Sequence, residues 1–350
     1  MRDRDLFELE LNKFARKSLP ITCHFDLTYH CNLNCIHCYI VENSIPELKT
    51  EEVKNILKEL ASAGILFLKF SGGEILCRED FFEIADYARK LHFSVDFITN
   101  GTLIDEELAD KISALHPFKV SISIYSTDPR VHDGITGVRG SLDNSMKAVK
   151  LLREKNLWVN ILDVVMQQNI NDYFQVFEFA KKWGAHFKLD TQVTPKINGD
   201  NSPVKFQVDD DDIFKLRMDP IVRGLDEEDL NDLENPASDL DSFIKDIPCG
   251  AGHNFFYISP YGDVFPCVQF PIYCGNLKIE SFKWIWNHSL NMLKVRSIRL
   301  SQLSGCSTCD DLDYCHFCPG LAYVEGGDME SSYPRACQDS MINRKIRELK

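Results

Sequence analysis

Three cysteines near the start of the chain have the types and spacing needed to hold a metal centre. Cys31, Cys35 and Cys38 follow a C-x3-C-x2-C pattern within one short segment. Three thiolates can hold three irons of a cubane cluster and leave the fourth iron open to a small-molecule ligand. A closed zinc site needs a fourth ligand, for which this segment offers only His30 and His37. The spacing therefore indicates either an iron–sulfur cluster with an open iron or a zinc site completed by a histidine.

A second group of cysteines occupies the last hundred residues. Two C-x2-C units five residues apart, flanked by further cysteines, are typical of metal ligands, whether of clusters or of a zinc knuckle. The chain has 13 cysteines, an odd number that favours metal or redox chemistry over a disulfide framework. The members of this group are Cys249, Cys267, Cys274, Cys306, Cys309, Cys315, Cys318 and Cys337.

The composition limits the class of protein that carries these cysteines. With 350 residues, 44% of them hydrophobic, the chain can bury a large core in one large or two medium domains. Its 39 basic and 53 acidic side chains give a net charge of −14, which argues against nucleic acid or an anionic membrane as a partner. No run of about 18 apolar residues and no apolar signal segment is present. We therefore expect a cytoplasmic protein.

The elements that must position the first cysteine group follow from hydrophobic periodicity. Short apolar runs alternate with amphipathic stretches of helical period, as in repeated β/α units on a parallel sheet. Six strands and five long connections favour an α/β fold with a partial (β/α)6 TIM-type barrel over a closed eight-unit barrel. We expect strands at 21–28, 65–71, 93–99, 118–125, 157–166 and 185–193, and helices at 50–62, 80–91, 105–114, 141–154 and 172–183.

The composition and the hydrophobic pattern divide the chain into four parts. Residues 1–20 form an N-terminal segment and 21–200 the barrel. Residues 201–247 form an acidic bridging segment, in which 209–246 contain fourteen acidic and four basic side chains. Residues 248–350 form a small cysteine-rich iron–sulfur domain with one helix-like stretch at 281–298. With so little core, that domain should depend on metal ligation for its fold.

A glycine-rich turn follows the second expected strand. Gly72 and Gly73 let the backbone approach a ligand closely, and exposed carbonyls beside the carboxylate of Glu74 suit a positively charged amino group. In a β/α fold the loops after successive strands lie at the same edge of the sheet. This turn should therefore face the loop of Cys31.

With these two motifs the chain resembles the radical S-adenosylmethionine (SAM) enzymes. The family's cluster loop reads C-x3-C-x-aromatic-C, with His37 at the aromatic position, and a Gly-Gly-Glu turn receives the methionine amino group. The resemblance implies that Cys31, Cys35 and Cys38 hold a catalytic [4Fe–4S] cluster. Its further implied contacts with SAM are Gly72, Gly73, Glu74, Asn100 and Ser123, with Gln168 and Asn169 as additional candidates.

Some residues depart from this pattern or have an ordinary structural explanation. The proline that usually follows Gly-Gly-Glu is Ile75 here. Asn100 and Ser123 are also compatible with ordinary sheet positions. Cys23 and Cys77 are interpreted as small buried apolar residues rather than ligands.

The C-terminal cysteine series resembles the SPASM extension of radical SAM enzymes, which holds two auxiliary [4Fe–4S] clusters. By that resemblance Cys249, Cys267 and Cys318 hold the nearer cluster. The nearer cluster is then one ligand short, and either Cys274 completes it or one iron stays open to solvent, to His253 or to substrate. The resemblance assigns the farther cluster to Cys306, Cys309, Cys315 and Cys337.

The resemblance implies reductive cleavage of SAM to a 5′-deoxyadenosyl radical that oxidatively modifies a substrate. We expect a peptide or protein substrate, joined by a thioether or carbon–carbon crosslink, and a reductant such as flavodoxin or ferredoxin. Val268 stands where sulfatase maturases typically carry Asp, which argues against that activity. About twenty residues precede the first strand, so either a peptide leader needs a separate binding protein or the substrate has no leader. The alternatives are a small molecule, such as a tetrapyrrole or nucleoside precursor, and a non-catalytic zinc-binding scaffold.

Overall fold

The computed structural model describes residues 14–41, 44–223 and 246–349. The described residues form a nine-stranded sheet in the order β6-β5-β4-β3-β2-β1-β7-β8-β9. Strand β1 (Thr22–Thr28) lies near the middle and pairs in parallel with β2 (Phe67–Gly72) and β7 (Phe255–Ile258). The other parallel strands are β3 (Ser94–Thr99), β4 (Lys119–Ser123), β5 (Val159–Val164) and β6 (His186–Asp190). The predicted α/β fold with a parallel sheet is confirmed.

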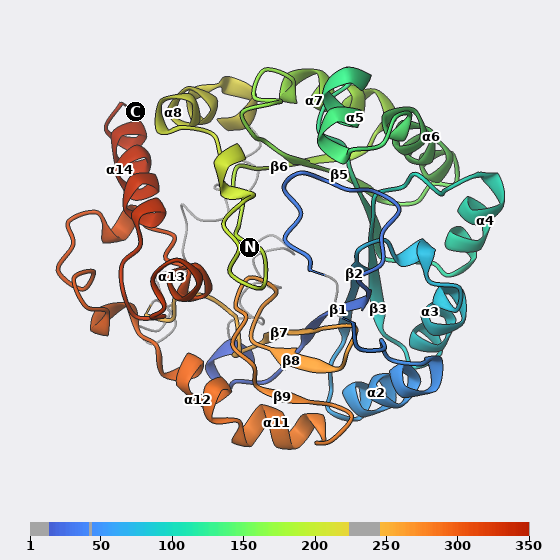
Figure 1. Cartoon of the computed structure of the whole chain (residues 1–350), viewed down its shortest axis with the longest axis horizontal. Coiled ribbons are helices and arrows are strands. Elements are labelled where there is room, and N and C mark those ends of the chain that lie inside the picture. Colours follow the sequence, from blue (N-terminus) through green and yellow to red (C-terminus); the bar gives the residue numbers. More distant parts are fainter. Residues whose placement is uncertain (1–13, 42–43, 224–245, 350) are drawn as a thin grey trace, which may run out of the picture.

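Helices cover the outer face of the curved sheet (Figure 1). Five of them match the amphipathic stretches of the sequence, because apolar residues at three- and four-residue intervals pack against the strands. These are α2 (Thr50–Ser62), α3 (Phe81–Lys90), α4 (Glu106–Ala114), α6 (Ser141–Glu154) and α7 (Tyr173–Trp183).

One short helix of the barrel was not expected from periodicity. Helix α5 (Pro129–Thr136) begins with Asp128, whose carboxylate accepts a hydrogen bond from the backbone N–H of Arg130, and has proline in its first turn. Gly137 ends it at a φ of 72°. These are ordinary start and stop signals, but eight residues are too few to show a clear apolar period.

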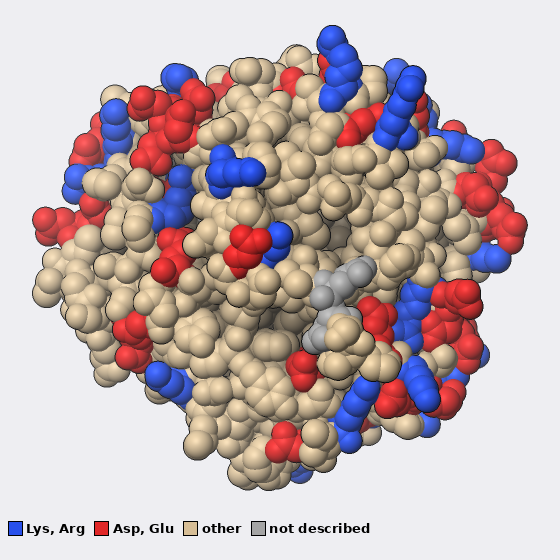
Figure 2. Space-filling model, in the orientation of Figure 1, with Lys and Arg blue, Asp and Glu red and all other residues tan. Residues whose placement is uncertain are grey.

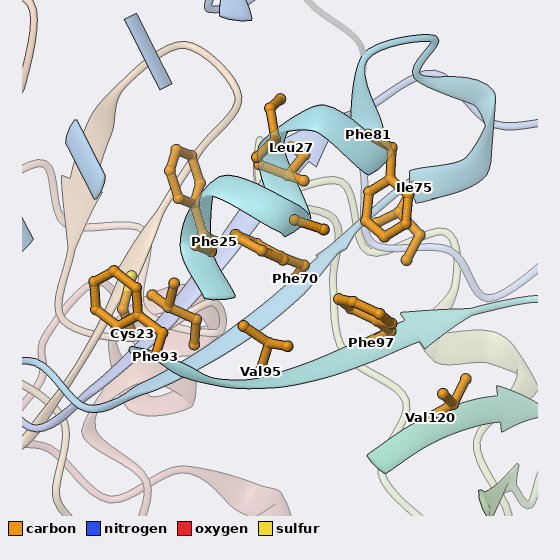
Figure 3. Packing of buried hydrophobic residues seen from close by; sticks show 14 of the residues in the cluster. Cys23, Phe25, Leu27, Phe70, Ile75, Phe81, Phe93, Val95, Phe97 and Val120 are labelled. Atoms are coloured by element: carbon orange, nitrogen blue, oxygen red, sulfur yellow. The ribbon is translucent and has the colours of Figure 1, made fainter. Parts of the chain in front are cut away.

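The main core lies between the sheet and the outer helices. Alternate residues of neighbouring strands contribute to it, and Phe70 and Phe97 stack with ring centroids 6.4 Å apart (Figure 3). Cys23 is completely buried in the same core, as its interpretation as a small apolar residue requires. Because successive side chains of a strand point to opposite faces, the remaining strand residues face the inside of the curve.

The C-terminal region continues the same sheet. β7 adds to β1 on the side away from β2, and β8 (Asp263–Phe265) and β9 (Gly275–Asn276) extend the edge in antiparallel pairs. Phe256 and Val264 join the main core. The sheet thus runs across residue 248, and a domain boundary there stays a prediction.

The remaining C-terminal elements surround a second, smaller apolar cluster that includes Phe270, Phe317 and Tyr333. The expected helix at 281–298 is two helices, α11 (Phe282–His288) and α12 (Leu290–Ser297), because Ser289 between them is extended. Periodicity did not reveal α13 (Pro319–Gly326) or α14 (Pro334–Glu348).

The expected acidic bridging segment is described only in part. It contains α8 (Asp210–Met218), while 224–245 lie outside the described residues, as do residues 1–13 of the expected N-terminal segment. In the described parts of the chain, no helix has the length and apolar character needed to cross a membrane.

Candidate active site and cluster-binding loops

The loop of Cys31, Cys35 and Cys38 follows β1 and is held in place by α5. The backbone N–H of Asn34 donates to the carbonyl of Thr136 (2.9 Å), and that of Ile36 donates to the carbonyl of Ile135 (3.0 Å). These bonds join the loop to the last turn of a helix about a hundred residues away in sequence. The missed helix therefore positions the cysteine loop.

The structure brings the three thiols of this loop together. Burial, together with the charges of the neighbouring thiols of the loop, raises the pKa of Cys31 to about 11 and of Cys35 to about 12. The backbone N–H of Leu33 lies 3.4 Å from the sulfur of Cys31. Buried thiols that repel one another as thiolates need a bound cation. Three such thiols on one loop fit a cluster held at three corners.

His37, at the family's aromatic position, is largely buried. Its ring contacts the ring of Tyr125 edge to face, with centroids 4.9 Å apart, and its Nδ1 has no hydrogen-bond partner among the described residues. Burial lowers the pKa of His37 to about 4. A neutral ring packed on tyrosine acts as an apolar support for the loop.

The Gly-Gly-Glu turn packs directly against the backbone that leads into the cysteine loop. A Cβ at Gly72, whose φ is 141°, would lie 2.0 Å from the carbonyl oxygen of Thr28, and a Cβ at Gly73 would lie 2.4 Å from that of His30. The N–H groups of Gly73 and Glu74 donate to these same two carbonyls. The glycines are thus required by the close approach of two chain segments.

The carboxylate of Glu74 is buried and has three protein donors. Its Oε1 accepts from the hydroxyl of Thr99 (2.6 Å) and the N–H of Leu76 (3.0 Å), and its Oε2 accepts from the N–H of Asn100 (2.7 Å). Burial raises the pKa of Glu74, and the three hydrogen bonds oppose that rise. The side chain therefore clamps the turn to the end of β3, and a direct contact with SAM stays a prediction.

Asn100 connects the third strand to the cysteine loop. Its side-chain amide donates to the side-chain oxygen of Asn32 (2.9 Å) and lies 3.9 Å from the sulfur of Cys31. Ser123 hydrogen-bonds the side chain of Tyr125, beside His37. Both residues predicted to contact SAM therefore lie next to the loop.

The two additional candidates behave differently. Asn169 is buried, and its amide bridges the carbonyls of Tyr125 (2.8 Å) and Val164 (3.1 Å), so it is fully used as a structural brace. Gln168 is exposed.

Cys77 is only half-buried and close enough for its charge to raise the pKa of Cys31, so its interpretation as a buried apolar residue is wrong.

Three C-terminal cysteines form a second group, near the strands that extend the sheet. Burial raises the pKa of Cys249 to about 12 and that of Cys267 to about 11, and the thiol of Cys318 raises both. Cys249 is exposed, and its thiol is near enough to Cys318 and Cys267 for their charges to raise its pKa. The structure thus brings together the three residues that the resemblance assigns to the nearer auxiliary cluster.

Four more cysteines form a third group on loops before α13 and at the start of α14. Burial raises the pKa of Cys315 to about 11, and the charges of Cys306, Cys337 and Cys309 raise it further. Cys309 and Cys337 are exposed. This grouping matches the residues expected for the farther cluster.

Cys274 is not brought to either C-terminal group. It is buried in the main core, and its thiol donates to the carbonyl of Ile272 (3.4 Å). The side chains that perturb its pKa, which burial raises to about 12, are Ser289 and Arg296 rather than cysteines. Burial, with the charges of Arg296 and Arg299, lowers the pKa of His253 to about 4. Neither residue is placed to complete the nearer group.

Among the described residues, no three His, Cys, Asp or Glu side chains form a group that could hold one metal ion. A cubane cluster takes its thiolates at separate corners, whereas zinc gathers them around one point. Iron, sulfide and zinc analysis of the protein distinguishes the two.

Two cavities lie between the cysteine groups and the surface. A cavity of about 60 Å³ has Tyr39, which follows Cys38, and Val268, which follows Cys267, in its lining. A cavity of about 780 Å³ shares Leu321 with the first and is lined by residues within 192–210 and of α13 and α14, among them amides, charged side chains and valines. The larger cavity adjoins the small one, which lies between the catalytic and nearer auxiliary loops.

Two family models match the chain. A model of the radical SAM superfamily matches residues 26–180. A model of the SPASM iron–sulfur cluster-binding domain matches residues 249–310.

Several characterised proteins are similar along most of their length. An AdoMet-dependent heme synthase of Methanosarcina barkeri is 29% identical over 91% of this chain and 97% of its own. The mycofactocin maturase MftC of Mycolicibacterium smegmatis is 30% identical over 91% of this chain and 83% of its own. The subtilosin biosynthesis protein AlbA of Bacillus subtilis is 29% identical over 88% of this chain and 68% of its own.

Solved structures share the fold. Streptococcus suis SuiB bound to S-adenosylmethionine superposes with a TM-score of 0.72 at 18% identity, covering 92% of this chain and 78% of SuiB. The anSMEcpe enzyme with bound AdoMet gives a TM-score of 0.69 at 17% identity, covering 94% of this chain and 97% of its own.

Proposed function

This chain belongs to the radical SAM superfamily and carries a C-terminal SPASM iron–sulfur domain, and from that premise we propose that it oxidatively modifies a peptide. In this proposal Cys31, Cys35 and Cys38 hold the catalytic cluster. Cys249, Cys267 and Cys318 hold a nearer auxiliary cluster, with Cys274 left out because it is buried in the core. Cys306, Cys309, Cys315 and Cys337 hold a farther one.

When bound, the catalytic cluster and SAM supply an electron and a 5′-deoxyadenosyl radical that removes hydrogen from a C–H bond. The work of this chain's own residues is positioning. α5 fixes the cysteine loop through the carbonyls of Ile135 and Thr136. Glu74 ties the glycine turn to β3, and His37 and Tyr125 keep the surroundings of the loop apolar.

The observation that carries the proposal is the small cavity shared by Tyr39 and Val268. Tyr39 directly follows Cys38 of the catalytic loop, and Val268 directly follows Cys267 of the nearer auxiliary group. A substrate group at this cavity would therefore lie between the catalytic loop and the nearer auxiliary group. The adjoining cavity of about 780 Å³ is lined by side chains such as Gln192, Asn201 and Gln338, whose amides can pair with a peptide backbone. These amides are the feature of the cavity that supports a peptide substrate.

A second candidate is the oxidation of a small molecule such as a tetrapyrrole. It is favoured by the similarity to the Methanosarcina barkeri heme synthase, which this chain matches over 97% of that protein's length. In both cases the substrate radical must lose an electron, and the auxiliary clusters are suited to accept it. A reductant such as flavodoxin or ferredoxin is part of either proposal.

The first experiment is anaerobic purification with reconstitution, followed by iron, sulfide and zinc analysis. Three cubanes require about twelve irons per chain. With dithionite and SAM, the protein should form 5′-deoxyadenosine. A zinc-loaded protein without 5′-deoxyadenosine formation would contradict the proposal.

The second experiment identifies the substrate class. An extract of the source organism is divided into a peptide-size fraction and a small-molecule fraction, and each is tested for stimulation of 5′-deoxyadenosine formation. We expect the peptide fraction to stimulate, and protease treatment of that fraction to remove the effect. Stimulation by the small-molecule fraction that survives protease would favour the tetrapyrrole-type alternative.

A further inference from the structure

A belt of polar side chains crosses the inner face of the sheet at one level. Register places His24 of β1 beside Tyr257 of β7 and Lys69 of β2, Lys69 beside Asp96 of β3, and Asp96 beside Lys119 of β4. Their neighbours along the strands, including Phe25, Phe70, Phe97 and Val120, pack outward in the main core. By strand alternation the five belt residues face the interior.

One lysine of the belt has no carboxylate partner. Lys119 pairs with Asp96 across the strands at 3.3 Å, and His24 is bonded to Asp26 at 3.1 Å. Lys69 has no carboxylate within ion-pair distance among the described residues, and its ammonium lies over the ring of Phe255, 5.9 Å from the centroid. Asp96 therefore pairs with Lys119 rather than with Lys69.

The surroundings of Lys69 disfavour its charged form. Burial lowers the pKa of Lys69, and the charges of Lys119 and Lys188 also lower it, whereas Asp96 and Cys267 oppose them. A partly buried ammonium without a hydrogen-bonded counter-ion is unfavourable until an anion reaches it. Lys69 is thus placed to bind a negative group that no carboxylate of the described residues supplies within ion-pair distance.

The belt lies near two parts of the candidate active site. Lys69 and Cys267 perturb each other's pKa, so the ammonium is within electrostatic range of the nearer auxiliary group. Along β2, Lys69 stands three residues before Gly72 of the glycine turn. Figure 2 shows most charged side chains around the rim of this face, with a few beside the hollow near its centre.

We propose that Lys69, assisted by Lys119, binds a carboxylate of the substrate inside the barrel. The inference rests on the proposed function, because it specifies what that substrate carries. A peptide with a free carboxylate and a small carboxylic acid share this chemistry, and the experiment has an arm for each. Phe255, below the ammonium, favours an apolar or aromatic group next to the carboxylate.

The test uses two matched pairs of probes and the cluster-loaded protein with SAM. One pair is 3-phenylpropionate and its neutral amide, 3-phenylpropanamide. The other is N-acetylphenylalanine and N-acetylphenylalanine amide, which mimic a peptide end with and without its charge. Binding is measured by calorimetry. We expect the acid of at least one pair to bind at least tenfold more tightly than its amide, a difference of about 1.4 kcal/mol.

Variants then assign the preference to the belt. Lys69→Met should remove the preference for the acid, Lys69→Arg should retain most of it, and Lys119→Met should weaken it. Lys90→Met is the matched control, because Lys90 is exposed on α3 and pairs with Asp86 on the outside of the barrel. It should bind both probes as the wild type does, and near-ultraviolet circular dichroism checks that each variant is folded.

Two results would overturn the inference. One is equal binding of acid and amide by the wild type in both pairs. The other is a preference for the acid that survives Lys69→Met. If that variant keeps the preference and changes only the redox titration of the clusters, Lys69 is a partner of the cluster and not of the substrate. Formation of 5′-deoxyadenosine by the wild type without any probe reports separately on the proposed function.

Discussion

The first and third cysteine groups use the same ligand type but are built in different ways. The loop of Cys31, Cys35 and Cys38 is tied by backbone hydrogen bonds to α5 and lies beside the glycine turn, at the carboxyl edge of a parallel sheet. The loops of Cys306 to Cys315 make mainly local turns, such as the bond from the N–H of Cys309 to the carbonyl of Cys306 (2.9 Å).

The difference concerns what holds each site together. Partners distant in sequence hold the first loop whether or not metal is bound. In the third group, Cys306 and Cys315 pack on the small apolar cluster that includes Leu303 and Phe317, while Cys309 and Cys337 are exposed. A region with so little apolar contact gains much of its folding free energy from its metal. The comparison teaches that the chain builds one site in advance and relies on the cluster to build the other.

The largest expected effect separates catalysis from folding at the first loop. Changing Cys31, Cys35 and Cys38 together to Ala should reduce 5′-deoxyadenosine formation to background, because no other three thiols lie at that edge among the described residues. The free energy of unfolding should change by only about 1 kcal/mol, measured by urea denaturation of the cluster-free protein. Cys77→Ala is the control and should retain cleavage. Cleavage of SAM by the triple variant would show that the catalytic cluster is elsewhere.

The next effect concerns the third group. Replacing Cys306 and Cys309 by Ala should loosen the loops between α12 and α14, because the metal that holds them is lost. Limited proteolysis should then cut within 300–318 much faster than in the wild type. Cleavage of SAM should persist at a lower rate, whereas modified product should be lost. If the variant resists protease as well as the wild type and forms product at the normal rate, the third group does not depend on its metal for folding. The first and third groups would then not differ in this respect.

A third prediction tests whether the first site is built by packing. Gly73→Ala places a Cβ 2.4 Å from the carbonyl oxygen of His30, so the turn and the cysteine loop must separate. We expect a loss of about 2 kcal/mol or more in the free energy of unfolding of the cluster-free protein. Gly134→Ala is the matched control, because no atom lies within 4 Å of its Cβ in α5. A gain of about 0.5–1 kcal/mol is expected there. Equal stability of the two variants would contradict the packing explanation.

The smallest expected effect concerns the second group. Cys274→Ala should lower the free energy of unfolding by about 1 kcal/mol through loss of buried contacts. The iron and sulfide content should not change, because the thiol faces Ile272, Ser289 and Arg296 rather than Cys267. Loss of about four irons would instead identify Cys274 as a cluster ligand. Cys267→Ala is the positive control.

Local pattern was sufficient for most of the barrel. The six strands of the barrel and five of its helices match the ranges that apolar periodicity predicts to within one residue beyond either end, because each buries one face or both faces against its neighbours. α5 was missed although Asp128 and Gly137 mark its ends, since eight residues give little periodic signal. α13 and α14 lie among cysteines and prolines, where apolar runs are short.

The grouping of the cysteines could also be anticipated, but not the position of Cys274. Resemblance to the family separated the three sets that the structure brings together. Sequence distance left Cys274 within reach of Cys267. The structure places Cys274 in the main core after β8, with its thiol near Ile272, Ser289 and Arg296, and its role as a ligand stays a prediction for the iron analysis of Cys274→Ala.

The sequence by itself determined the alternation of strands and helices, which is a local property of the chain, and its motifs, through the family resemblance, indicated the three sets of thiols. Only the tertiary structure decided that β7 pairs with β1, which brings the C-terminal cysteines to the same sheet as the catalytic loop. It also decided that Lys69, Asp96 and Lys119 stand side by side on the inner face. The physical reason is register: hydrogen bonds between distant strands set which side chains become neighbours, and no local pattern contains that information.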